Sequence, residues 1–192
     1  MRLPYKEGRV DLTSTYGKRS LNGCEEFHGG IDLVGRGSKE IVAVSDGLVV
    51  RSRVVSDRRD RTWEWGEYAA VSHADGTIAY YCHMSERKVK QGDRVREGDV
   101  IGIEGSTGKS TGSHLHFEVR KGNGQIDPAA YLGIENRCAA LIAGADSAGA
   151  DDAAVCRACV AARCGFEQQT IEYLNRYPYA DDLWRKLCAA MR

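Results

Sequence analysis

The sequence TGSHLHFEVRKGNGQIDP, from Thr111 to Pro128, contains two of the five histidines and decides the fold. Its alternating polar and apolar residues predict a half-buried β-strand, because successive side chains of a strand point to opposite faces. The polar face carries His114, His116 and Glu118, and the apolar face carries Leu115, Phe117 and Val119. The two imidazoles lie roughly 7 Å apart at Cα on one face, close enough to share an ion. Alone, this pair is more typical of surface histidines on a half-buried strand, because metal sites need more than two ligands.

A second stretch, FHGGID, offers further ligands, with His28 and Asp32 four residues apart. In an extended strand their Cα atoms would be roughly 13 Å apart, so both can reach one ion only if the chain bends between them. Gly29 and Gly30 permit this bend. One imidazole and one carboxylate from here, with one imidazole from the distant strand, would leave a coordination position for water, as catalytic zinc sites do. The alternative is a turn with a capping Asp.

The chain up to residue 136 has the pattern of an all-β unit. Runs such as EIVAVSDGLVV and EYAAVSHADGTIAYYCHM are rich in β-branched residues and are separated by Asp-Gly turns. Such runs are typical of antiparallel strands joined by hairpins. We therefore predict a mainly β fold with a domain over residues 1–136.

Composition changes near residue 137, since the last 55 residues hold 14 of the 21 alanines but 3 of the 22 glycines. We predict a small helical C-terminal domain over residues 137–192, with three short helices that begin at Asp151. We interpret four of its cysteines as small residues that fill gaps between helices: Cys156, Cys159, Cys164 and Cys188. A zinc knot formed by the same four cysteines is the alternative. Nothing in this segment identifies a ligand.

Charge and hydropathy exclude several classes of protein. Lys and Arg number 27, as do Asp and Glu, so net charge gives no argument for a nucleic-acid partner. No run of 18 apolar residues predicts a membrane span. The sequence as given begins without the apolar region of a signal peptide, so we expect synthesis in the cytoplasm. Seven irregularly spaced cysteines favour free thiols over a disulfide framework.

Six segments together resemble the lysostaphin-type (LytM-like) zinc metalloendopeptidases, which cut peptidoglycan. They run in family order between about Thr13 and Leu132: TSTYGKR, FHGGIDL, VAVSDGLVV, YAAVSHADGTIAYYCHMS, VKQGDRVREGDVIGIEGSTGKSTGSHLHFEV and IDPAAYL. The resemblance implies a compact antiparallel β core with a groove across one sheet. It further implies that Zn²⁺ is bound by His28, Asp32 and His116, that His83 and His114 are catalytic, and that the substrate is a peptidoglycan peptide.

The chemistry agrees with these roles. Zinc polarises a peptide carbonyl and lowers the pKa of bound water, and an imidazole that titrates near neutrality can move the proton. The pattern leaves open how His83 and His114 divide the work. No His-Glu-x-x-His helix is present. His73 is interpreted as a structural or surface residue, and Cys24 and Cys82 as buried free cysteines. Glu118 either orients a ligand or is solvated.

Two alternatives to an active peptidase remain at this point. One is an inactive LytM-like module that binds or activates a cell-wall hydrolase, although such a protein would be expected to have lost ligands. The other is a biotinyl or lipoyl carrier domain, suggested by the hairpin VKQGDRVREGDVIGIEG. In such a domain the cofactor lysine should lie at the top of a tight turn, whereas Lys109 lies inside the glycine-rich loop EGSTGKSTG.

The expected synthesis without an export signal favours a phage lysin or virion-associated enzyme that acts at the cell wall. An extracellular bacterial protein given without its leader is the alternative. In the loop SDRRDRTWEWGEY, Trp63 and Trp65 either wall the cleft or pack onto the sheet.

Overall fold

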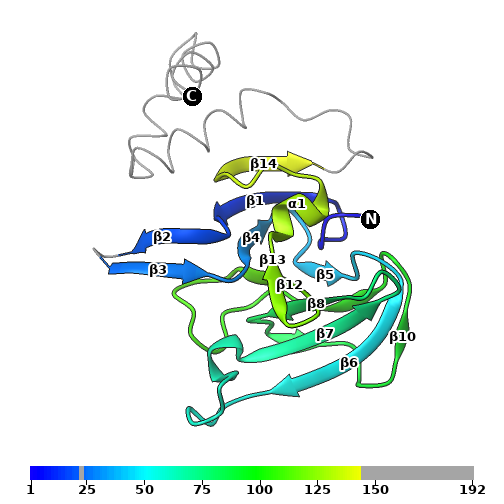
Figure 1. The fold of residues 1–192 in the computed structure, drawn as a ribbon. Coiled ribbons are helices and arrows are strands. Elements are labelled where there is room, and N and C mark those ends of the chain that lie inside the picture. The colour runs from blue at the N-terminus through cyan, green and yellow to red at the C-terminus, as the bar shows by residue number, and fades with distance from the viewer. Residues whose placement is uncertain (22–23, 144–192) are drawn as a thin grey trace.

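The computed structural model describes residues 1–21 and 24–143. Its main feature is a nine-stranded sheet, in which all strand pairs are antiparallel. The strands follow in the order β10 (Arg94–Val95), β6 (Gly47–Val54), β7 (Glu67–His73), β8 (Thr77–Cys82), β12 (Leu115–Lys121), β4 (Ile31–Gly35), β1 (Arg9–Ser14) and β14 (Ala139–Ala143), with β13 (Gly124–Ile126) paired to β12 (Figure 1).

Two smaller sheets complete the fold. One contains β5 (Glu40–Val42), β11 (Val100–Ile103) and β9 (Glu86–Arg87). The other is a hairpin of β2 (Gly17–Leu21) and β3 (Cys24–His28), which extends to one side as an arm (Figure 1). The helices described are the short α1 (Pro128–Leu132) and one 3₁₀ turn, Trp63–Trp65. The predicted mainly β, antiparallel fold is confirmed.

The core forms because the strands present alternating apolar faces. Leu115, Phe117 and Val119 of β12 are fully buried, as the alternation in the sequence predicts. They join a large cluster that includes Ile31 and Leu33 of β4. Burial of each such side chain contributes about 1.5–3 kcal/mol. The opposite face of β12 is thereby fixed towards the functional site.

The sheet extends further along the chain than predicted. Residues 139–143, which composition assigned to the helical segment, form β14, and Leu12 of β1 lies opposite Ala139. Pairing with the edge of β1 uses backbone groups, so an alanine-rich segment can form a strand despite its low β-propensity. The helices expected from Asp151 onwards, and the four cysteines expected among them, lie outside the described residues. In the part of the chain that is described, no helix is long and apolar enough to span a membrane.

Candidate metal centre and cleft

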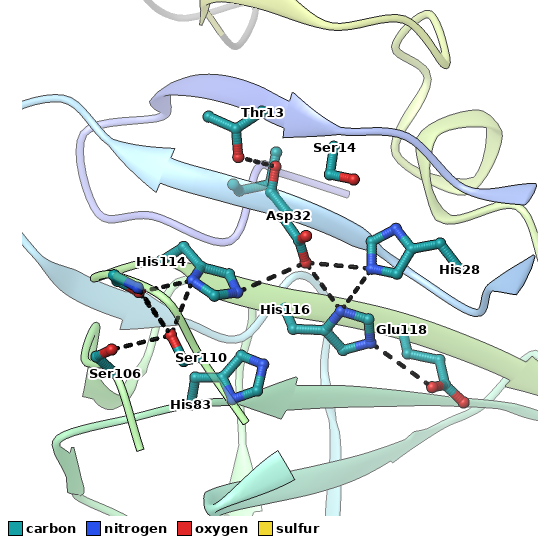
Figure 2. Close-up of polar contacts among 12 residues, drawn as sticks. Thr13, Ser14, His28, Asp32, His83, Ser106, Ser110, His114, His116 and Glu118 are labelled. Carbon is teal, nitrogen blue, oxygen red and sulfur yellow. Dashed lines mark hydrogen bonds and ion pairs between the residues drawn. The ribbon is translucent and has the colours of Figure 1, made fainter. Parts of the chain in front are cut away.

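Strand register brings the predicted ligands together. His116 of β12 lies directly opposite Asp32 of β4 on one side and Cys82 of β8 on the other. His28 ends β3, and the chain bends at Gly29 and Gly30 before β4 begins. The bend that the two glycines predicted is therefore present, and it turns the imidazole of His28 back over β4 (Figure 2).

Three donor atoms converge at this point. Nδ1 of His116 lies 2.9 Å from Oδ1 of Asp32 and 3.0 Å from Nε2 of His28. The remaining side of the triangle, from His28 Nε2 to Asp32 Oδ1, is 3.3 Å. A tetrahedral zinc ion with ligand distances of about 2.0–2.1 Å places neighbouring donor atoms about 3.3 Å apart. The described residues hold this one group of three or more side chains with metal-ligand spacing.

The contacts on the outer side of each imidazole leave the nitrogen inside the triangle as an acceptor. His28 Nδ1 lies 2.8 Å from the carbonyl of Thr15, so this nitrogen carries the proton and Nε2 is left as an acceptor. Nε2 of His116 faces the Glu118 carboxylate at 3.8 Å, which favours a proton there and leaves Nδ1 as an acceptor. Three electron-rich atoms within 3.3 Å repel one another unless a positive charge lies between them. The donor set therefore fits a divalent cation.

The close contacts in the triangle also shift the pKa values of Asp32 and His116. Burial disfavours the charged form of Asp32, but hydrogen bonds with His116 and His28 outweigh it and hold the carboxyl pKa far below its usual range. Burial likewise disfavours charged His116, yet its contacts with Asp32 and Glu118 raise its pKa to about 9. Both shifts favour a positive charge beside the Asp32 carboxylate.

Gly30 allows the close approach on which this geometry depends. A Cβ atom at Gly30 would lie 2.8 Å from Nε2 of His116 and 2.5 Å from the carbonyl oxygen of Phe117. Real Cβ atoms do not approach other atoms so closely, so any larger residue would displace the His116 ring.

The two predicted catalytic histidines lie on the other side of Asp32. The rings of His83 and His114 are 4.7 Å apart between centroids, and His114 Nε2 lies 3.8 Å from Asp32 Oδ1 (Figure 2). Nδ1 of His114 lies 2.8 Å from the carbonyl of Gly112, which directs Nε2 towards the metal ligands. All five residues predicted for the site therefore gather in one place.

His83 is held in an unusual conformation. It has a positive φ of 64°, which no other described non-glycine residue shares. Its backbone N–H donates to the carbonyl of Trp65, and its Nδ1 lies 2.8 Å from the carbonyl of Thr107. Burial, followed by the neighbouring imidazoles of His114 and His116, lowers its pKa to about 4. At neutral pH His83 is thus uncharged, with Nε2 as a proton acceptor.

These side chains line a cleft of about 880 Å³. Trp63 and Trp65 both border it, and Trp65 also packs edge-on against Tyr68 and in a tilted arrangement against Tyr80. The two interpretations of the tryptophan loop therefore both hold, since the aromatic rings cover the sheet and wall the cleft at once. Gly108 permits this wall, because a Cβ there would lie 2.4 Å from the carbonyl of Glu64.

Other predicted residues lie apart or play a supporting part. His73 is buried beside the carbonyl of Asp46 and does not line the cleft, in keeping with a structural role. Cys82 is a buried free thiol, as predicted. The side chain of Cys24 lies outside the described part of the structure. Glu118 is buried and contacts the Nε2 side of His116, so it is not a solvated residue.

Sequence reasoning missed the groups that orient the histidines. Thr15, Thr107 and Gly112 act through carbonyl oxygens, so no side-chain pattern marks them. Glu104 was also missed, although its carboxylate contacts the Ser113 hydroxyl next to His114. A charged residue in an otherwise apolar strand run, VIGIEG, was the available signal.

Residues 26–128, more than half of the chain, match the family described as Peptidase family M23. The chain belongs to this family. Membership of the lysostaphin-type peptidases, which the motifs predicted, is thereby confirmed.

Three relatives of this M23 chain illustrate its similarities. One is the catalytic domain of the prophage-encoded M23 protein EnpA from Enterococcus faecalis, solved as a single-substitution mutant. Its sequence is 39% identical and its structure matches with a TM-score of 0.54, over 64% of this chain and 91% of that one. Peptidoglycan DD-endopeptidase ShyC of Vibrio cholerae is 35% identical over 110 residues, 56% of this chain and 24% of that protein. Stage II sporulation protein Q of Bacillus subtilis is 33% identical over 117 residues, 59% of this chain and 39% of that protein.

The SpoIIQ-SpoIIIAH pore forming complex also matches in structure, with 26% identity and a TM-score of 0.58, covering 68% of this chain and 89% of that one. The chain spans about a quarter of the length of the first curated relatives that it matches.

Proposed function

We propose that this M23 chain is a zinc-dependent endopeptidase that hydrolyses peptide bonds in the cross-links or stem peptides of bacterial peptidoglycan. The observation that carries the proposal is the triangle of His28, Asp32 and His116 donor atoms, with two further imidazoles beside it in a cleft. Two nitrogens and one carboxylate oxygen match the preference of catalytic zinc sites, and three protein ligands leave one position for a reacting group. The names of the peptidoglycan DD-endopeptidases among its relatives support the substrate class.

When bound, a zinc ion would polarise the peptide carbonyl and acidify the attacking water. The carbonyls of Thr107 and Gly112 hold the Nδ1 atoms of His83 and His114, so both rings present Nε2 to the cleft. We assign proton transfer from water to the departing amine to this pair, whose rings are in contact range at 4.7 Å. The carbonyls of Thr107 and Gly112 fix the orientation of the two rings, which reduces the entropy lost when the rings meet the reacting groups.

We further propose that the protein acts at the bacterial cell wall, as a phage lysin or virion-associated hydrolase would. Its similarity to the catalytic domain of a prophage-encoded M23 protein supports this proposal.

The test is digestion of purified peptidoglycan, with mass spectrometry of the released peptides and elemental analysis of the protein. Wild type should bind one zinc ion per chain and release peptides, and a chelator should abolish the release. His116→Ala should lose both zinc and activity, whereas His73→Ala, which removes a buried histidine outside the cleft, should keep both. Zinc-independent cleavage, or full activity of His116→Ala, would contradict the proposal.

A protein that binds zinc but releases no peptide from any peptidoglycan would instead support the alternative function. In that case the chain would be a module that binds or activates a partner, as the SpoIIQ-SpoIIIAH complex illustrates for a relative. Pull-down of cell-wall hydrolases by the purified chain would then test the alternative directly.

A further inference from the structure

The cleft is lined by charged side chains, and most of them are already paired. On one wall, Arg19 forms a 2.5 Å ion pair with Glu26. On the other, Lys109 contacts Glu64 at 3.0 Å. Each of these four side chains thus has its charge balanced before any ligand arrives, which reduces its pull on a charged substrate.

The floor of the cleft is balanced in the same way. Arg120 pairs with the buried carboxylate of Glu118 and also lies over the rings of Trp65 and Tyr80. Asp32 contacts the histidine cluster. The charges of Arg120 and Asp32 are thus already compensated by neighbouring residues. Only a bound cation would add net charge at this part of the cleft.

Arg58 differs from all of these residues. It lines the cleft, it is exposed, and no carboxylate of the described residues pairs with it. The two acidic residues nearest in sequence have their own partners, since Asp57 contacts Arg59 and Asp60 contacts Arg53. Arg58 is therefore the cleft-lining charge that remains unbalanced within the described structure.

The guanidinium of Arg58 also lies close to an aromatic ring. Its central carbon lies 5.4 Å from the centroid of the Trp63 ring, a cation–π arrangement. This contact uses no hydrogen-bond acceptor, so the N–H groups along the edge of the guanidinium are available to a ligand. Those edge groups match the two oxygens of a carboxylate and can bind both at once.

We propose that Arg58 is a specificity-determining residue that binds a free carboxylate of the substrate peptide. This inference rests on the proposed peptidase function and names a feature of its substrate, an anionic group distant from the scissile bond. Both the C-terminal carboxylate and a side-chain carboxylate of a stem peptide have the required chemistry. Trp63 acts as a positioning residue, because it holds the guanidinium through its ring.

The experiment compares three synthetic cross-linked stem peptides: one with free carboxylates, one amidated at the C-terminus and one amidated at the side chain. The zinc-loaded wild-type chain should show a KM about tenfold higher for one of the two amidated peptides, with kcat unchanged, since one partly shielded charge-assisted pair is lost. The peptide that loses affinity identifies the carboxylate that Arg58 binds.

Variants assign the effect to the residue. Arg58→Gln should show the higher KM for all three peptides and no discrimination among them. Arg59→Gln, which removes a neighbouring arginine outside the cleft, should behave like wild type. Equal KM values for the three peptides with wild type, or discrimination that survives Arg58→Gln, would overturn the inference while leaving the peptidase function intact.

Failure of the proposed function itself would give a different result, because wild type would then cleave none of the peptides. Calorimetric titration of the same peptides still tests Arg58 in that case. Binding that weakens about tenfold on amidation of one carboxylate, and is insensitive to amidation in Arg58→Gln, supports the inference. Equal binding of all three peptides overturns it.

Discussion

Replacement of Glu104 by Gln should destabilise the protein at neutral pH without removing any metal ligand. The Glu104 side chain is fully buried and accepts four hydrogen bonds. Its four donors come from three separate segments of the chain: Tyr5 Oη at 2.5 Å; Gly35 N at 2.9 Å and Lys39 Nζ at 2.8 Å, both at the β4–β5 connection; and Ser113 Oγ at 2.7 Å. An amide of the same shape keeps one acceptor oxygen but places a donor where a second acceptor is needed.

The loss of stability in Glu104→Gln depends on which of the former hydrogen-bond donors can find another acceptor. Lys39 is 43% exposed and can turn to water, whereas Tyr5 and the Gly35 N–H are buried beside the remaining oxygen. Hydrogen bonds to charged groups contribute about 1.5–3 kcal/mol each, part of which the amide oxygen retains. We expect a loss of about 2–3 kcal/mol, which corresponds to a fall in Tm of about 5–10 °C for a chain of this size.

The stability difference between wild type and Glu104→Gln should change with pH in a defined direction. Burial opposes ionisation of Glu104, but its hydrogen bonds with Lys39 and Tyr5 outweigh burial and lower its pKa. The resulting stability is fully present above the unfolded pKa of about 4.3 and is lost as the pH falls through the folded value. The difference between wild type and Glu104→Gln should therefore be constant from neutral pH to about pH 5 and shrink below that.

Thermal and urea unfolding across this pH range measure both effects. Glu135→Gln is the matched control, since its side chain is 73% exposed, and it should change stability by less than about 0.5 kcal/mol. Because Ser113 precedes His114, kcat of Glu104→Gln should also fall while zinc binding persists. A variant as stable as wild type at pH 7, or a difference that widens on acidification, would refute the reasoning.

Three further predictions concern the site and its wall. Gly30→Ala should weaken zinc binding at least about tenfold, measured by competition with a chromogenic chelator, because its Cβ would displace His116. His83→Asn should keep zinc but reduce kcat by about 10²–10⁴-fold, and an unchanged rate on purified peptidoglycan would remove His83 from proton transfer. Trp65→Ala should lower the free energy of unfolding by about 2–3 kcal/mol, because the ring packs on Tyr80; urea titration should show this loss, and an unaltered midpoint would contradict it.

The sequence was sufficient for the parts of the site that depend on local periodicity. Alternation predicted that His116 and Phe117 would face opposite ways, and Phe117 is fully buried while His116 faces the cleft. The two glycines before Ile31 predicted the bend that returns His28 to its neighbours. Both features follow from backbone geometry within a few residues, which is where sequence patterns carry information.

The sequence was insufficient where an interaction depends on distant backbone. The carbonyls that orient His28 and His83 belong to Thr15 and Thr107, and every residue type has such a carbonyl. Strand β14 was missed for a related reason, since its pairing with β1 depends on an available edge rather than on β-branched side chains. Burial of Glu104 depends on partners up to 99 residues away, which no local pattern records.

The register of three strands links the stability of the fold to the chemistry of the site. Asp32, His116 and Cys82 lie in one row across β4, β12 and β8. A slip of β12 by one residue would turn His116 into the core and Phe117 into the cleft, so the metal triangle and the apolar packing would be lost together. The core side chains of β12 that exclude this slip are therefore required for the site, although they never contact it. Substitutions such as Phe117→Ala should accordingly reduce zinc binding only to the extent that they unfold the protein.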